Sequence, residues 1–426
     1  MFANGGEQRI QPALKDAAAE LHDDEETDGS CGAGGCLRSC THVRSDVKRG
    51  ERDHIIMKAP CFRWMKLQLS SDILRFMQEY MLDPLEERII HALQIEGRAP
   101  WSELAPVIGV DAVPLARRWD ALRERGLAWV TGIFPGGATA LIDITCAPQH
   151  IGDVAQQIAQ IPSVLTLDHT SGGRDLLATM LADHPLAIWD VVTNHIGAFE
   201  GVRNTQTHLV TEVIMEASDW RLRALTPQET VKVPRPRPPR ARAPRGVHPE
   251  VEGALRHCLP EDGRRPISRI AAEHGLSEQR VADGLARMRA DGQLRIRTDV
   301  ARSVTGWPVY AWYFVRTAAK HIPQIKGLMA QIPEARTALA VASQYNLIVA
   351  VWLRDLTDVM RFEAALEAAV PSARIVDRSV VFRMSKHLGR LIDEQGRATM
   401  GFVHPAATAN RAASRESPAV SAVLEE

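Results

Sequence analysis

The feature that most constrains this chain is an internal repeat. The segment EGRAPWSELAPVIGV, which begins at Glu96, returns as DGRRPISRIAAEHGL from Asp262. Six residues recur in register at a constant offset of 166 residues, namely Gly97, Arg98, Pro100, Ser102, Ala105 and Gly109. A repeat marks one structural unit that is used twice. At 426 residues the chain also exceeds what one hydrophobic core usually serves, so several domains are expected.

Each copy has the pattern of three short helices. Gly109 and Gly275 can adopt the left-handed backbone of the turn before the third helix. Leu115, Trp119 and Leu122 form the apolar stripe of that helix and leave its arginines on the outer arc, where they can reach the major groove of DNA. The predicted DNA-binding residues are Ser102, Asp111, Arg117, Arg118, Arg123 and Arg125 in the first copy and Ser277, Gln279, Arg280 and Arg287 in the second.

The segment after each three-helix unit has the pattern of an α/β domain. In ALIDITC, for example, Ile142, Ile144 and Cys146 alternate with polar residues, which is typical of a strand. Both copies continue in the order βαββαβ, the ferredoxin-like split unit. The predicted class is α+β: two tandem copies of a winged or trihelical helix-turn-helix domain, each followed by a ferredoxin-like domain of the RAM type.

The predicted domains follow from this repeat. Between the copies, closely spaced prolines disfavour helix and sheet and favour an extended linker. Its arginines either keep the spacer hydrated or contact phosphates; they are Arg235, Arg237, Arg240, Arg242 and Arg245. The boundaries are a disordered extension at 1–81, helix-turn-helix domains at 82–132 and 247–302, ferredoxin-like domains at 133–225 and 303–390, a linker at 226–246 and a disordered tail at 391–426. A translation start at Met77 or Met81 is an alternative to a translated extension.

Composition leaves nucleic-acid binding open. The net charge is -1, but binding to DNA needs only a local basic face. The chain lacks both a long apolar run and a secretory signal, so a cytoplasmic, nucleoid-associated protein is expected. Cys31, Cys36, Cys40 and His42 do not have the paired spacing of zinc sites, and neither metal nor cofactor is predicted. Cys146 and Cys258 are expected to be reduced and buried.

These features together resemble the Lrp/AsnC family of transcriptional regulators. The resemblance is carried by LDPLEERIIHALQIEGRAP from Leu82, the turn at Gly109, the helix ending ALRERGL and the βαββαβ domain. It covers residues 82–225 and 247–390, and the tandem arrangement is similar to double-length members from actinobacteria. It implies binding to promoter or operator DNA, an amino acid or related metabolite as effector, and self-association through the α/β domains.

The resemblance also implies where an effector binds. Family members have a Gly-x-(aromatic)-Asp turn between the second and third strands. The first copy has Arg174 at the aromatic position, whereas the second keeps an aromatic residue but replaces the Gly and the Asp. The implied effector-binding residues are Gly172, Gly173, Asp175, Ser343, Tyr345 and Asn346. The effector site can be degenerate, shared between the halves or lost, and the turns can also be plain strand connections.

An enzyme is the main alternative to a regulator. Siroheme decarboxylases have the same architecture and are expected to carry histidines and an arginine near the turn before the third strand. The second copy reads ASQYNLIV without a histidine, and the first offers His169. We therefore expect no enzymatic activity, because too few protonatable groups converge. A siroheme decarboxylase-like enzyme and a non-DNA-binding interaction protein remain as alternatives, and the operator, effector and oligomeric state stay open.

Overall fold

The computed structural model describes residues 81–329, 331–370 and 372–406. The predicted N-terminal extension lies outside these residues, apart from Met81, and so do the cysteines and histidine considered there as metal ligands. Within the described part of the chain, no helix is long and apolar enough to cross a membrane.

The first repeat forms three helices, α2 (Pro84–Ile95), α3 (Trp101–Ile108) and α4 (Ala112–Glu124). Asp83 caps α2 in a capping box with Glu86, which satisfies amide groups at the start of the helix. Gly109 ends α3 with a φ of 79°, as the turn requires. The stripe predicted for the third helix is buried: Leu115, Trp119 and Leu122.

The second repeat forms a matching set of helices, α8 (Pro249–Cys258), α9 (Ile267–His274) and α10 (Glu278–Ala290). Gly275 has a φ of 64° and ends α9 as Gly109 ends α3. Gly284, in the middle of α10, is buried because α8 packs against it: a Cβ there would lie 2.5 Å from Val251 Cγ1. The mid-helix glycine is therefore a packing requirement of this unit.

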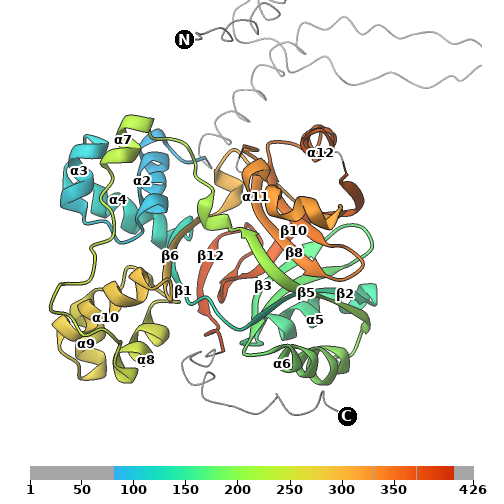
Figure 1. Ribbon diagram of the computed structural model, residues 1–426, viewed down its shortest axis with the longest axis horizontal. Coiled ribbons are helices and arrows are strands. Elements are labelled where there is room, and N and C mark those ends of the chain that lie inside the picture. The colour runs from blue at the N-terminus through green and yellow to red at the C-terminus, as the bar shows by residue number, and fades with distance from the viewer. Residues whose placement is uncertain (1–80, 330, 371, 407–426) are drawn as a thin grey trace, which may run out of the picture. The chain divides into compact units, whose positions relative to one another are not determined.

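The two three-helix units contact each other through the repeated Gly-Arg pair. Arg98 donates to the carbonyls of Gly263 (2.6 Å) and Arg265 (3.0 Å). Arg264 donates in the same way to the carbonyls of Gly97 (2.7 Å) and Ala99 (3.0 Å). The contact is reciprocal, as in a two-fold symmetric dimer. Figure 1 shows the two units next to each other, beside the larger α/β part.

Strands β1 (Ala128–Ile133) and β6 (Arg295–Val300) extend this contact as an antiparallel pair, from Ala128 opposite Val300 to Ile133 opposite Arg295. Each strand follows the third helix of its own unit. The repeated glycines lie against this pair: a Cβ on Gly263 would be 2.7 Å from Val130 Cγ1, and one on Gly97 would be 2.6 Å from Ile296 Cγ2. Close packing explains why glycine occurs in both copies.

The α/β part contains two ferredoxin-like units in the predicted βαββαβ order. The first unit consists of β2 (Ala138–Cys146), α5 (Ile151–Ala159), β3 (Val164–Thr170), β4 (Leu176–Ala182), α6 (Pro185–Asp190) and β5 (Val202–Met215). The second consists of β7 (Val309–Arg316), α11 (Ile322–Met329), β8 (Ala335–Ala342), β9 (Leu347–Leu353), α12 (Asp358–Ala369) and β10 (Arg374–His387).

The two units close on each other within one chain. Strand β5 pairs with β8, β10 pairs with β3, and β10 also pairs with β7, so these strands form a closed ring. The two junctions have the same register and bulges at equivalent places: Val210 lies opposite Val341, and Val381 lies opposite Thr170. Equivalent residues of the α/β units are thus 171 positions apart.

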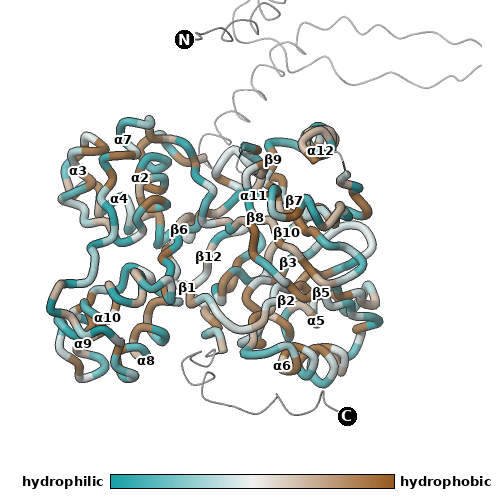
Figure 2. The backbone as a smooth tube through the Cα atoms, viewed as in Figure 1, coloured by the Kyte–Doolittle hydropathy of each residue, from teal (hydrophilic) through white to brown (hydrophobic). Residues whose placement is uncertain are grey.

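Alternating side chains of the strands fill three cores. Helices α5 and α6 cover the outer face of the first unit, and α11 and α12 cover that of the second. The inner faces meet in a core that includes Leu141, Trp312 and Phe314 and continues into the first three-helix unit. Strand β9 is buried along its whole length and almost entirely hydrophobic (Figure 2).

Two sequence predictions need correction. In the linker, helix α7 (Pro227–Lys232) forms where no helix was expected, because Thr226 and Glu229 make a capping box and Pro227 is tolerated in the first turn. In the tail, the hairpin β11 (Arg390–Ile392) and β12 (Ala398–Phe402) is ordered, and Ala398 N–H donates to Gly126 O at 2.8 Å. Residues 407–426 lie outside the described part.

Candidate nucleic-acid interface and effector turns

Two of the predicted DNA-binding arginines already have protein partners. Arg118 lies 2.8 Å from the carboxylate of Asp83, and Arg125 lies 3.2 Å from that of Glu86. Both carboxylates belong to the capping box of α2, so these arginines join α4 to the start of α2. Both guanidinium groups are still almost half exposed, and exposed ion pairs of this kind are weak.

Arg117 is different, because it is exposed and forms no ion pair with the described residues. It lies in the second turn of α4, the helix that corresponds to a recognition helix. Val113, one turn earlier, is 62% exposed, although the sequence analysis did not single it out. Arg123 points toward Asp262 of the second repeat at 3.8 Å. The other predicted residues of this unit are exposed, namely Ser102 and Asp111.

The predicted residues of the second unit form a less basic surface. Ser277 caps α10 and accepts from the amide of Arg280, and Gln279 donates to Asp283 at 3.1 Å. Arg280 is exposed and lies 3.9 Å from a glutamate of α8, while Arg287 is half-buried. The sequence repeat places Asp283 where the first unit has Arg117.

The linker contacts both units. Arg240 binds the carboxylate of Asp283 with two hydrogen bonds (2.9 and 2.6 Å), and Arg237 lies 3.0 Å from Glu103 on α3. The linker side chains, the start of α3 and the outer face of α10 line a pocket of about 390 Å³. Two linker arginines of this surface, Arg237 and Arg240, therefore contact protein carboxylates.

The predicted effector turns are ordered by their polar residues. The Asp175 carboxylate accepts from the amide of Cys146 at 2.7 Å, and Asn346 Oδ1 accepts from that of Thr317 at 2.9 Å. Gly172 has a φ of 90°, which favours glycine. Gly173 and Ser343 are exposed. These residues hold the two turns against the strands rather than converging on one point.

The variable residue of each turn is buried at the junction of the halves. Arg174 is 3% exposed, with Nε 2.9 Å from Asp143 and Nη2 2.7 Å from Asp377 of the other half. Its guanidinium also stacks over Phe314 at 3.8 Å. Tyr345 crosses in the opposite direction to His208 of the first unit, with ring centroids 5.5 Å apart, and also lies 5.2 Å from Phe314 of its own unit. The structure thus brings together the residues at the aromatic position of the turn, where the two copies differ.

His208 completes this junction. It is fully buried, its Nε2 lies 3.2 Å from Asp143 Oδ2, and its ring lies 5.5 Å from that of Tyr345. The strand registers make Ser379 its counterpart, and Ser379 accepts from Arg174. The sequence analysis missed His208, because a histidine inside a predicted strand does not reveal its partners on other segments of the chain.

A second buried carboxyl lies on the same inner face. Asp168 is 1% exposed and accepts from Trp312 Nε1 at 2.9 Å. Burial raises the pKa of Asp168 to about 7, opposed by the Trp312 hydrogen bond and by the charge of Arg302. His169, the histidine considered in the enzyme alternative, instead contacts Ser385 at 2.6 Å, and burial lowers its pKa to about 4.

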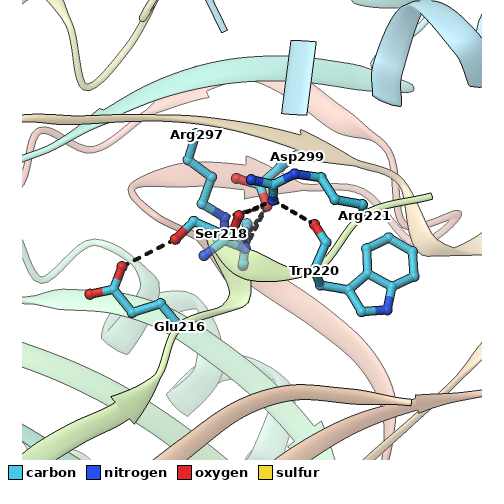
Figure 3. Close-up of polar contacts among 7 residues, drawn as sticks. Glu216, Ser218, Trp220, Arg221, Arg297 and Asp299 are labelled. Carbon is cyan, nitrogen blue, oxygen red and sulfur yellow. Dashed lines mark hydrogen bonds and ion pairs between the residues drawn. The ribbon is translucent and has the colours of Figure 1, made fainter. Parts of the chain in front are cut away.

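A third polar cluster joins the end of β5 to β6 (Figure 3). Arg221 donates to the carbonyls of Ser218 and Trp220, and Arg297 pairs with Asp299 at 2.5 Å. Although burial opposes it, Arg297 with His387 holds the pKa of Asp299 well below its usual value. The ion pair of Arg295 with Glu216, which directly follows β5, fastens the segment that leaves the first α/β unit to the strand that enters the second.

Family comparisons identify two domains. The AsnC-type helix-turn-helix domain matches residues 82–123, and the Lrp/AsnC ligand binding domain matches residues 139–220. The chain therefore carries Lrp/AsnC-type helix-turn-helix and ligand-binding domains in its first half. The matched ranges contain α2 to α4 except the last residue of α4, and the first α/β unit except the first residue of β2.

Similar proteins of known type match about one third of the chain. An uncharacterized HTH-type transcriptional regulator of Pyrococcus furiosus is 27% identical over 139 residues, which cover 31% of this chain and 94% of that protein. The regulator AldR of Mycolicibacterium smegmatis is 29% identical over 146 residues, which cover 32% of this chain and 85% of AldR.

Two solved structures are similar to parts of this chain. The siroheme decarboxylase NirDL covers 74% of this chain and 96% of its own, with 15% identity and a TM-score of 0.48. AsnC of E. coli covers 31% of this chain and 94% of its own, with 19% identity and a TM-score of 0.27.

Proposed function

We propose that this protein is a sequence-specific DNA-binding transcriptional regulator rather than an enzyme. The observation that carries the proposal is the exposed face of α4, which presents the unpaired Arg117 within an AsnC-type helix-turn-helix domain. In this arrangement the first turns of the recognition helix meet base edges in the major groove. Arg117 is suited to a guanine edge or a phosphate, and Val113 to a thymine methyl group.

The neighbouring Arg118 and Arg125 support this role, because each can exchange its carboxylate partner for a DNA phosphate. The pairs of Arg118 with Asp83 and of Arg125 with Glu86 are partly exposed, so phosphates can replace the carboxylates at little cost. Phosphate contacts position the helix, whereas base contacts provide specificity.

We further propose that the second three-helix unit is a helix-turn-helix domain. One chain then presents two DNA-binding units, as a homodimer of a single-length regulator would. The reciprocal arginine contacts and the closed ring of strands hold the two units as a symmetric dimer would hold its two subunits. Since Asp283 replaces Arg117 in the second unit, the two half-sites are expected to differ in sequence and in affinity.

An amino acid or related metabolite is the proposed effector of the α/β part. The matched ligand binding domain at residues 139–220 supports this proposal. An effector regulates DNA binding only if it binds one arrangement of the two units more tightly than another.

The buried ionisable groups of the junction argue against catalysis, because they bind one another. Arg174, His208 and Asp143 are the strongest candidates for acid–base chemistry, but their partners are protein groups of the junction. Catalysis needs such groups within reach of a substrate. Absorbance titration with an iron tetrapyrrole tests this alternative: a specific, saturable spectral change would contradict our proposal.

The test is a fluorescence-anisotropy titration of the full chain with its own upstream DNA and with a scrambled duplex, over a series of salt concentrations. We expect an affinity for the upstream DNA about a thousandfold above that for the scrambled duplex. Arg117→Ala should reduce specific binding by about 1–3 kcal/mol.

Arg203→Ala is the matched control, because it removes an exposed arginine of β5 and changes the net charge equally. It should leave specific binding unchanged. Equal, weak affinity of the wild-type chain for both duplexes would contradict the proposal for this target. Equal losses of affinity in the two variants would mean that Arg117 acts only through its charge and not through a specific contact of α4.

A further inference from the structure

A cluster of metal-ligand side chains lies between α8 and α9 of the second three-helix unit. Cys258, Glu273 and His274 place one ligand atom each within 4.8 Å of one another. Cys258 comes from the last residue of α8, and the other two come from the end of α9. A thiolate, a carboxylate and an imidazole are the ligand types that zinc and similar divalent ions prefer.

The first repeat shows what these positions hold when no ligand is needed. At the same offset of 166 residues it has Ala92, Val107 and Ile108. All three are buried apolar residues at the contact of α2 with α3. Three substitutions to metal-ligand types at one helix contact, in a unit that otherwise keeps its fold, need a reason beyond packing.

The distances fit a shared ion. The Cys258 sulfur lies 3.4 Å from His274 Nε2 and 4.0 Å from Glu273 Oε2. In a tetrahedral zinc site, bond lengths near 2.3 Å to sulfur and 2.1 Å to nitrogen place those two atoms about 3.5 Å apart. The side chains therefore need little movement to bind the same ion.

The surroundings also suit a bound ion. Cys258 is 1% exposed, while Glu273 and His274 are exposed, so an ion can enter from solvent on one side. Arg265 and Arg269 bind the Glu273 carboxylate and fix its orientation, as partners of ligating carboxylates do. Cys258 loses its proton to solvent when it binds as thiolate, so Cys258 and Glu273 together offer the ion two negative charges.

We propose that Cys258, Glu273 and His274 form a binding site for a divalent transition metal of the zinc class, with solvent at the remaining position. This site departs from the sequence analysis, which predicted no metal. It is independent of the proposed function, because it concerns the stability of the second unit and not its DNA contacts.

The experiment is a cobalt(II) titration of the full chain in which Cys258 is the only thiol. Cys31, Cys36, Cys40 and Cys61 are replaced by Ser and Cys146 by Ala, which removes every other cysteine of the sequence. We expect one ion per chain and a thiolate-to-cobalt charge-transfer band, which zinc then displaces.

Three variants restore the residues of the first repeat: Cys258→Ala, Glu273→Val and His274→Ile. Cys258→Ala should abolish the charge-transfer band, and His274→Ile should weaken cobalt binding at least about tenfold. His257→Ala is the control, since its ring lies beside His274 at 5.9 Å but is not a proposed ligand. Circular dichroism checks that each variant is folded.

A second measurement covers the case in which the band is too weak to resolve. Zinc, but not magnesium, should raise the melting temperature of the single-thiol chain, and His274→Ile should remove that shift. Absence of both the band and the shift, or an affinity unchanged by His274→Ile, would overturn the proposal.

Discussion

The two three-helix units share a backbone but differ in the residues that face solvent. Both have a left-handed glycine before the third helix, and both use the Gly-Arg pair for their mutual contact. Where the first unit exposes Arg117, the second has Asp283, which is neutralised by Arg240 of the linker. The contact between the units is therefore the same in both copies, whereas the chemistry of their exposed faces has diverged.

The two α/β units differ in a complementary way. The strand registers make Asp143 equivalent to Phe314 and His208 equivalent to Ser379. In the turns, Arg174 is equivalent to Tyr345. At these positions the first unit has Asp, His and Arg, whereas the second has aromatic and hydroxyl side chains and contributes a charge through Asp377. The junction is therefore built for these two halves together and not for two copies of either half.

The largest expected effect comes from breaking this junction. Arg174→Met leaves the carboxylate of Asp143 buried without its cation, which should cost about 3–5 kcal/mol of unfolding free energy. Urea denaturation measures the change. Arg378→Met is the control, because Arg378 is half exposed in its pair with Glu363 and should cost under about 1 kcal/mol. Equal effects of the two substitutions would refute the asymmetric junction.

A second prediction exchanges equivalent residues between the halves. Lys386 is fully buried, donates to Ile161 O at 2.9 Å, and occupies the position that Met215 has in the first unit. Burial lowers the pKa of Lys386 from its ordinary value of 10.5 to about 7. Between these two pH values the unfolded chain therefore binds a proton that the folded chain does not. Lys386→Met should therefore increase stability by about 2 kcal/mol near pH 7.

The pH dependence sharpens this test. The stability that the wild-type chain has above pH 10.5 is lost as the pH falls to about 7, because the folded state resists protonation of Lys386. The gain from Lys386→Met should vanish near pH 10.5. A gain that is the same at pH 7 and 10 would mean that packing, and not charge burial, explains it.

A third prediction concerns the charge difference between the three-helix units. Asp283→Arg places the residue of the first unit in the second and removes a negative charge from the outer face of α10. We expect about tenfold tighter binding to nonspecific DNA at low salt, with a steeper salt dependence by about one phosphate contact. Unchanged anisotropy curves would show that α10 does not approach DNA.

The smallest expected effect is that of the linker contact. Arg240→Ala removes the two hydrogen bonds to Asp283, but the arginine side chain is 56% exposed. Exposed pairs contribute little because water screens them, so the midpoint of urea denaturation should stay that of the wild-type chain. A lower midpoint would show that the linker is part of the folded core.

The helices, most of the strands and the repeat could be predicted from the sequence, because they follow from the local spacing of apolar residues and from glycines that end helices. The hairpin at 390–402 was also readable in principle: Asp393 accepts from the amides of Gln395 and Arg397, and Gly396 has a φ of 78°, both typical of a turn. The capping residues Thr226 and Glu229 likewise indicate the start of α7.

The partners of the buried polar side chains, by contrast, could not be predicted before the fold was known. Arg174 looked like a defect in a turn motif, but it is the centre of the junction because β10 of the other half carries Asp377 and Ser379 to it. Arg118 and Arg125 looked free on a helical wheel, yet their partners lie at the start of a different helix. Contacts between distant segments depend on how strands close and helices cross, and local spacing contains no record of them.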